Sequence, residues 1–360
     1  MTYWLGEPLL YLCFAVVFGW LTVIRARETD AVSRMPVTLI QASVIGIGVF
    51  SFLPVLRIIM FFAEDAGFVA TLKSVLFTTT EGKAYAWTLL FCLMLLFVIK
   101  FGAPAHNKQV WPWILCVILC LGLTITVSWT SHMTANYGLP GLFANLVHVL
   151  AVMVWSGTLI AAGWFKADGS SWSKFLSWFH ILAMIAMVLI MASGWLLTAT
   201  IAPEYVNSFA LPYGQALLIK HLLILPLLIF ALMNGVLVKR KLSRDPSFQP
   251  FAWARAESFI VLAIYVITGY MNQQHAPLEV SETLRDAPAS PLFLRFHQGY
   301  QDAALRLQWE PVGMICVIIA LGCLAGMLLM FRNNKNAYLS ITLGLFFVLM
   351  AYLAVMTSIA

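Results

Sequence analysis

Long apolar stretches separated by short polar segments recur along the whole chain. A helix of about 20 apolar residues crosses a hydrocarbon core about 30 Å thick. The stretches therefore predict ten transmembrane spans, at residues 4–24, 37–62, 84–101, 111–130, 142–165, 174–199, 214–238, 253–271, 311–331 and 337–358. This pattern predicts an all-α fold, a polytopic transmembrane helical bundle in the lipid bilayer.

The composition supports that prediction, and the distribution of charges predicts the orientation of the bundle in the membrane. Hydrophobic residues make up 62% of the chain and charged residues only 10%. With the N-terminus outside, 14 lysines and arginines fall on the inner side and 5 on the outer side. Short cytoplasmic loops retain basic residues, so we expect both termini outside. The basic residues form no aromatic-interleaved or single-faced patch, which argues against nucleic acid as a partner.

The spans divide the chain into four predicted regions. Residues 1–110 form a three-span region, 111–275 a five-helix core, 276–310 an external loop and 311–360 a two-span hairpin. The mixed stretch Phe293 to Trp309 predicts an amphipathic helix on the outer surface. All six cysteines lie within spans, which indicates no disulfide framework. Cys116 and Cys120 share a helix face and are either apolar packing residues or a soft-metal pair.

Four of the seven histidines cluster near the outer ends of spans: His132, His148, His221 and His275. His132 is expected in an outer loop beside Met133, and His148 and His221 on the order of 10 Å below the outer boundary. Imidazole and thioether groups suit copper, and thioether favours Cu(I). These five residues are the predicted metal site, although each histidine can instead be a packing or solvated residue.

One face of the sixth span carries His180, Met184, Met187 and Met191. Their i, i+4, i+7, i+11 spacing places them on a single stripe. Such a stripe would pass Cu(I) inward, and the alternative is methionine filling gaps between helices.

Two cations inside spans favour a different cofactor. Arg57 and Lys220 either snorkel to the interface or pair with an anion. The propionates of haem b would be suitable anions, and His148 with His221 would supply two axial ligands. The alternative function is therefore transmembrane electron transfer by a b-type haem protein.

A family resemblance is carried by the segment Leu146–Leu159, LVHVLAVMVWSGTL. It resembles the H-x6-W-x-G-x-L signature of the CopD family of bacterial copper-resistance and copper-uptake membrane proteins. Trp155 shares a helix face with His148 and would pack under its imidazole as structural support. The segments around His132, Tyr213–Lys220 and Arg255–Glu257 resemble other elements of the family.

The resemblance implies copper handling at the bacterial inner membrane, often with a periplasmic copper-binding partner of the CopC type. We expect uptake or transfer of copper ions from the periplasm. The chain shows no phosphate loop or nucleophile motif, so no catalytic residue is predicted and it is not expected to be an enzyme. A third possibility is an assembly factor that delivers copper to a membrane oxidase.

Overall fold

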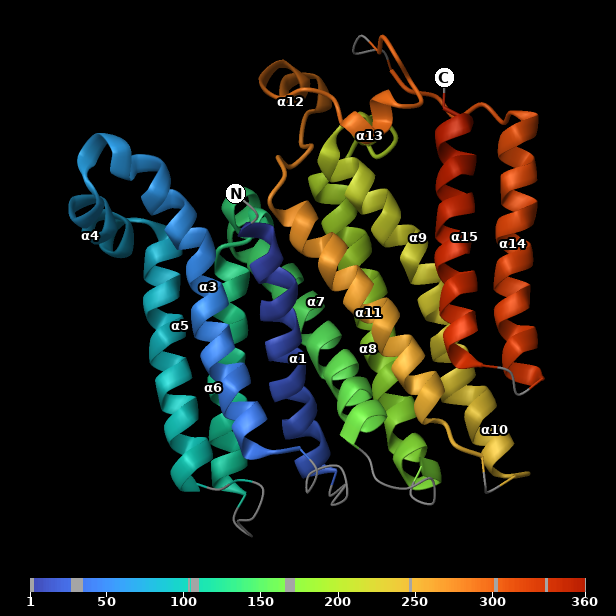
Figure 1. Cartoon of the computed structure of the whole chain (residues 1–360). Coiled ribbons are helices and arrows are strands. Elements are labelled where there is room, and N and C mark those ends of the chain that lie inside the picture. The colour runs from blue at the N-terminus through green and yellow to red at the C-terminus, as the bar shows by residue number, and fades with distance from the viewer. Residues whose placement is uncertain are drawn as a thin grey trace. The chain divides into compact units, whose positions relative to one another are not determined.

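The computed structural model describes residues 3–26, 35–102, 104, 110–165, 172–245, 248–300, 304–333 and 336–359. Arg27, Arg34, Lys108, Lys166 and Lys335, which contribute to the predicted charge bias, lie outside these residues. The described residues form helices and one isolated antiparallel bridge, Leu307 with Ile359. Ten helices among them are long and apolar enough to cross a membrane, as the sequence predicted (Figure 1).

The ten spans are built from the long helices and from two π-helical extensions. They are α1 (Gly6–Arg25), α3 (Val37–Ala66), α5 (Thr80–Phe97) with η2 (Val98–Gly102), α6 (Trp111–Trp129), α7 (His132–Phe165), α8 (Trp172–Ile201), α9 (Pro212–Leu232) with η5 (Met233–Leu237) and α10 (Val238–Leu242), α11 (Phe251–Asn272), α14 (Pro311–Arg332) and α15 (Ala337–Thr357). The shorter helices are η1 (Tyr3–Leu5), α4 (Phe68–Thr78), η4 (Asn207–Ala210), α12 (Val280–Asp286) and α13 (Pro291–Leu294).

Several spans begin where the sequence supplies a helix start signal. Pro212 and Pro311 occupy the first positions of α9 and α14, where a proline lacks only a hydrogen bond that the helix does not make. Thr79 caps α5 by accepting a hydrogen bond from the Gly82 amide at 3.0 Å. Asn336 caps α15 in the same way through the Tyr338 amide at 2.9 Å.

The chain forms two compact units. The first contains Met1–Asp168 and Ile181–Leu197, and the second contains Gly169–His180 and Thr198–Ala360. Helix α8 contributes to both units, because its middle belongs to the first and its two ends to the second. The four regions predicted from the sequence describe the order of elements along the chain and stay a prediction.

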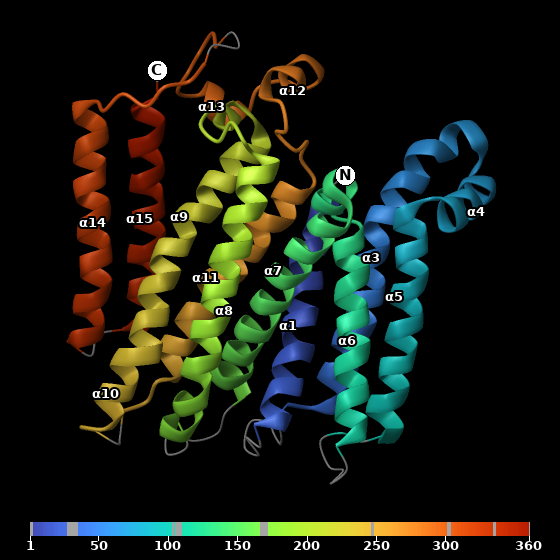
Figure 2. The ribbon, with the colours of Figure 1, turned by 180° about the vertical axis from the view of Figure 1, so that it is seen from behind.

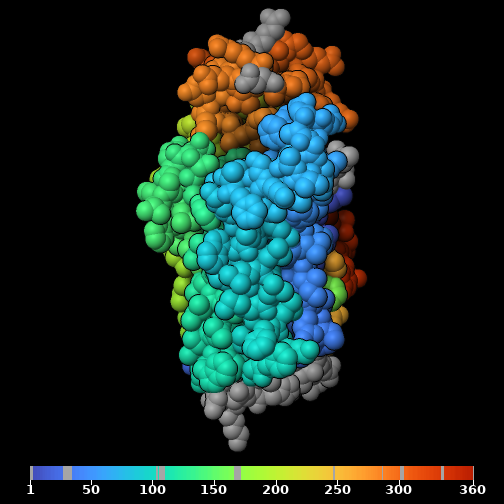
Figure 3. Space-filling model, turned by 90° about the vertical axis from the view of Figure 1, so that its left-hand side faces the viewer, coloured from blue at the N-terminus to red at the C-terminus, as the bar shows by residue number. Residues whose placement is uncertain are grey.

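In the first unit, α1 packs between α7 and α3 (Figure 2). Gly19 and Gly157 meet at the crossing of α1 and α7, where a Cβ on either residue would overlap the backbone of the other helix. Small residues let transmembrane helices approach this closely. The short helix α4, which the sequence analysis missed, packs against the ends of α3 and α5 (Figure 3). Its buried contacts include Val75 with Ile59 of α3.

In the second unit, α9 packs against α11, α14 and α15. The buried side chain of Gln215 joins two of these helices, because it accepts a hydrogen bond from the Tyr352 hydroxyl at 2.6 Å. The Gln215 amide also donates to the Phe209 carbonyl at 2.6 Å. A buried apolar cluster that includes Phe209, Phe293 and Met356 covers this end of α9.

Two predictions about the polar segments are wrong. The first placed His132 and Met133 in a loop, whereas both are the opening residues of α7. Ser131 caps this helix, since its hydroxyl accepts from the Thr134 amide at 3.3 Å. The helical axis then breaks at Gly138, whose φ of 59° and ψ of −134° suit glycine.

The second wrong prediction is the amphipathic helix from Phe293 to Trp309. Among the residues described in this range, the only helical ones belong to the end of the four-residue helix α13, and Gly299 turns the chain with a φ of 81°. Residues 304–310 are not helical, and the Gln308 amide donates to the Ser358 carbonyl at 2.6 Å. Pairing with the end of α15 thus replaces local helix formation here.

Candidate functional site

His148 lies on α7 in the first unit, half-buried, with its Nδ1 atom 3.0 Å from the Ser193 hydroxyl of α8. The Ser193 hydroxyl donates its single hydrogen to the Leu189 carbonyl of its own helix. Its oxygen therefore accepts from His148, which places the imidazole proton on Nδ1. In that tautomer the lone pair is on Nε2, one of the two nitrogens through which a neutral histidine binds a metal.

The residue after Ser193 makes room for this imidazole. A Cβ on Gly194 would lie 3.3 Å from His148 Cε1 and 3.7 Å from His148 Nδ1. The Ser193–Gly194 pair of α8 thus holds the ring by a hydrogen bond and by close packing. Trp155, two turns after His148 on α7, is 4% exposed, and its predicted packing under the imidazole stays a prediction.

His221 lies on α9 in the second unit and is also contacted through Nδ1. Its Nδ1 atom is 2.7 Å from the Tyr205 hydroxyl, and the two ring centroids are 5.6 Å apart. Burial raises the pKa of Tyr205 to about 12, so the phenol stays protonated near neutral pH. A hydroxyl both donates and accepts, and Tyr205 can accept from Nδ1–H when Nε2 binds a metal.

The remaining predicted ligands differ in exposure. His132 and His275 are exposed, whereas Met133 is buried at 4% exposure. His132 and His148 belong to one unit, and His221 and His275 to the other. Among the residues that the structure describes, no three His, Cys, Asp or Glu side chains are grouped to hold a metal. The site of four histidines and Met133 therefore stays a prediction.

The predicted stripe on α8 begins at His180, which is half-buried. Met184 and Met191 are 59% and 49% exposed, and Met187 is half-buried. Two of the three thioethers thus lie on the surface of the chain, which suits contact with lipid as well as an ion path. The pathway stays a prediction.

The two cations of the haem alternative are on different units. Arg57 is exposed on α3, which packs against α1, α4 and α5. Lys220 is half-buried on α9, next to His221 in the sequence. Haem ligation by His148 and His221 with these cations stays an untested alternative, and so does a soft-metal role for Cys116 and Cys120, which are 0% and 1% exposed.

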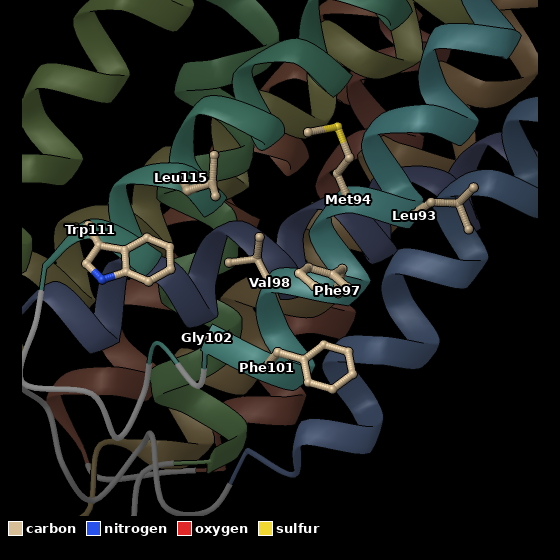
Figure 4. A pocket seen from close by; sticks show the side chains of 8 residues that line it. All are labelled: Leu93, Met94, Phe97, Val98, Phe101, Gly102, Trp111 and Leu115. Carbon is tan, nitrogen blue, oxygen red and sulfur yellow. The ribbon is translucent and has the colours of Figure 1, made fainter.

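An apolar pocket of about 540 Å³ lies between α5, η2 and α6 (Figure 4). Its lining is almost wholly apolar and consists of Leu93, Met94, Phe97, Val98, Phe101, Gly102, Trp111 and Leu115. Met94 is the one lining side chain with a metal-binding atom, so this pocket lacks the donor set of a metal site.

Two polar contacts of the site, those of Ser193 and Tyr205, were not predicted from the sequence, and neither was the separate buried pair of Asn234 with Glu257. Ser193 and Gly194 form a polar and small pair inside a largely apolar span, a signal that could have been used. Tyr205 lies in the segment between α8 and α9 and has no such signal. Asn234, like Glu257, is a polar residue inside a span, which is itself a reason to suspect a function.

Ten apolar helices and intramembrane histidines held by hydroxyl groups define a multi-pass α-helical membrane protein with potential metal ligands. Residues 7–142 match the family model "Copper resistance protein D-like, N-terminal domain", and residues 173–271 match the model "Copper resistance protein D". The chain belongs to the CopD family of copper resistance proteins. The Leu146–Leu159 segment lies between the two matched ranges. Comparisons with curated proteins and with solved structures gave no match.

Proposed function

We propose that this protein takes up copper ions from the periplasm and transfers them through the bacterial inner membrane without chemically transforming a substrate. Membership of the CopD family supports copper as the cargo. The observation that carries the proposal is the Nδ1 contact of His148 with Ser193, which directs a lone pair to Nε2 inside a membrane span.

The other predicted ligands have assigned roles in this proposal. The exposed imidazoles of His132 and His275, one in each unit, meet copper at the periplasmic end, and the buried thioether of Met133 follows His132 in the sequence. His148 and His221 receive it deeper in the spans, each oriented by a hydroxyl. Both termini are periplasmic, and a CopC-type copper-binding protein delivers the ion.

Copper accumulation in cells tests the role of His148. His148→Ala removes the proposed ligand, and we expect copper uptake to fall by about tenfold or more. Asn145→Ala, almost one turn earlier on the same helix, is the matched control and should behave like the wild type. Wild-type uptake by His148→Ala at equal protein level would refute the assignment of this entrance.

An absorption spectrum of the purified protein separates copper transfer from the haem alternative. The proposal expects no Soret band in either the oxidised or the dithionite-reduced protein. A Soret band that sharpens on reduction, with resolved α and β bands, would make His148 and His221 haem ligands. Lower copper loading of a membrane oxidase, with unchanged copper uptake on deletion, would instead indicate an assembly factor.

A further inference from the structure

The second unit contains a buried hydrogen-bonded pair, Asn234 with Glu257, that is separate from the candidate ligands His221 and His275. Asn234 and Glu257 are 7% and 2% exposed, and the Asn234 amide nitrogen donates to Glu257 Oε2 at 2.7 Å. The same nitrogen donates to the Trp253 carbonyl at 3.0 Å. Both amide hydrogens are thereby used, which fixes the orientation of Asn234 and makes Glu257 Oε2 an acceptor.

This hydrogen bond positions the Glu257 carboxyl group without setting its charge. Oε2 accepts from Asn234 when the group is a carboxylate, and equally when the proton is on Oε1. The donor is a neutral amide rather than a cation, so it does not offset the cost of a buried negative charge. The acid form is therefore favoured until a cation arrives.

The backbone around Asn234 is unusual. Asn234 and Gly235 lie in η5, a π-helical turn that interrupts the span between α9 and α10. A Cβ on Gly235 would lie 3.1 Å from His180 Nδ1, so this glycine lets the imidazole approach the backbone. One wide turn thus contacts both a carboxyl group and an imidazole, and π-helical turns are frequent at functional sites.

Other titratable and charged groups belong to the surrounding elements. They include His180 on α8, Lys220 and His221 on α9, Lys239, Arg240 and Lys241 on α10, Arg255, Tyr265 and Tyr270 on α11, Arg332 on α14, and Tyr338 and Tyr352 on α15. The Lys241 ammonium lies 4.9 Å from the centre of the Phe331 ring and 4.5 Å from that of Phe248. The same ammonium donates to the Phe331 carbonyl at 3.4 Å.

We propose that Glu257 is a proton-exchange site that couples copper(I) transfer to proton movement, an inference that rests on the proposed function. When a copper(I) ion enters this part of the unit, the Oε1–H bond breaks and the proton leaves to water. The carboxylate then balances the charge of the ion. The released proton goes to the outer side, and when the ion leaves inward the carboxylate takes up a proton from the inner side. Each copper ion that moves inward is thus exchanged for one proton that moves outward, and neither step changes an oxidation state.

The test uses the full chain in proteoliposomes with external copper(I), internal copper analysis and a pH-sensitive dye. The wild type should release about one proton for each copper ion transferred. Glu257→Gln keeps an acceptor for Asn234 but cannot exchange a proton, so it should transfer copper slowly and without the proton signal. Glu282→Gln, an exposed acid on α12, is the matched control and should match the wild type.

The outcomes distinguish this inference from the proposed function. No copper transfer by the wild type would refute the proposed function itself. Copper transfer by the wild type without a proton signal, or the same proton signal in Glu257→Gln, would overturn only the role of Glu257. Glu257→Asp tests for a purely structural effect of the substitution, because it keeps a titratable group. A proton signal in Glu257→Asp but not in Glu257→Gln supports the proposal, and equal behaviour of the two variants overturns it.

Discussion

Ser193→Ala removes the hydroxyl that accepts from His148 Nδ1 and leaves the rest of α8 unchanged. Ser193 is 7% exposed, so water does not readily replace the lost acceptor. An unsatisfied buried N–H costs about 1–3 kcal/mol, which favours rotation of the ring or transfer of its proton to Nε2. Either change removes the oriented Nε2 lone pair. Loss of such a partner typically weakens metal binding by about 10–100-fold.

The assay measures copper(I) affinity in detergent by competition with a chromophoric chelator. A 10–100-fold weakening corresponds to about 1.4–2.8 kcal/mol. Ser43→Ala is the matched control, because Ser43 is a buried serine of the same unit whose hydroxyl donates to the Leu39 carbonyl at 2.9 Å. The reasoning is refuted if Ser193→Ala binds copper as tightly as Ser43→Ala while His148→Ala binds more weakly.

Two further variants test the second histidine and the helix crossing. Tyr205→Phe keeps the ring contact with His221 but removes the hydroxyl that lies 2.7 Å from Nδ1. Copper(I) affinity should therefore fall by about tenfold in the same assay. Unchanged affinity would exclude a role of the Tyr205 hydroxyl in orienting His221. A Cβ on Gly157 would overlap the Ala15 carbonyl of α1, so Gly157→Ala should lower the free energy of unfolding by about 1–3 kcal/mol in thermal unfolding. Gly48→Ala, whose Cβ would make only an ordinary contact at 3.6 Å, should not. Equal unfolding temperatures for the two alanine variants would argue against close packing at the crossing.

The ten spans were predictable because lipid imposes a uniform requirement on each of them. A spanning segment must bury its backbone polar groups in a helix and expose apolar side chains, and both requirements are visible in the sequence. The polar segments obey no such rule. His132 looked like a loop residue, yet Ser131 caps a helix there, and Gly138 divides that helix from the predicted span.

The site was only partly predictable for a related reason. The sequence identifies His148 and His221 as polar residues inside spans, but their orientation depends on partners from other segments. Ser193 is 45 positions from His148, and Tyr205 is 16 positions from His221. A pairing across such distances depends on helix packing, which periodicity in one segment does not reveal.

The close crossing of α1 and α7 also bears on how the chain is assembled during synthesis. Helix α1 is synthesised before α7, the partner that covers Gly19, and three of the described spans lie between them in the sequence. At about 5–20 residues per second, this interval lasts on the order of ten seconds. During that time the glycine surface of α1 faces lipid or the insertion machinery. Biogenesis of this protein therefore depends on keeping α1 available until its partner arrives.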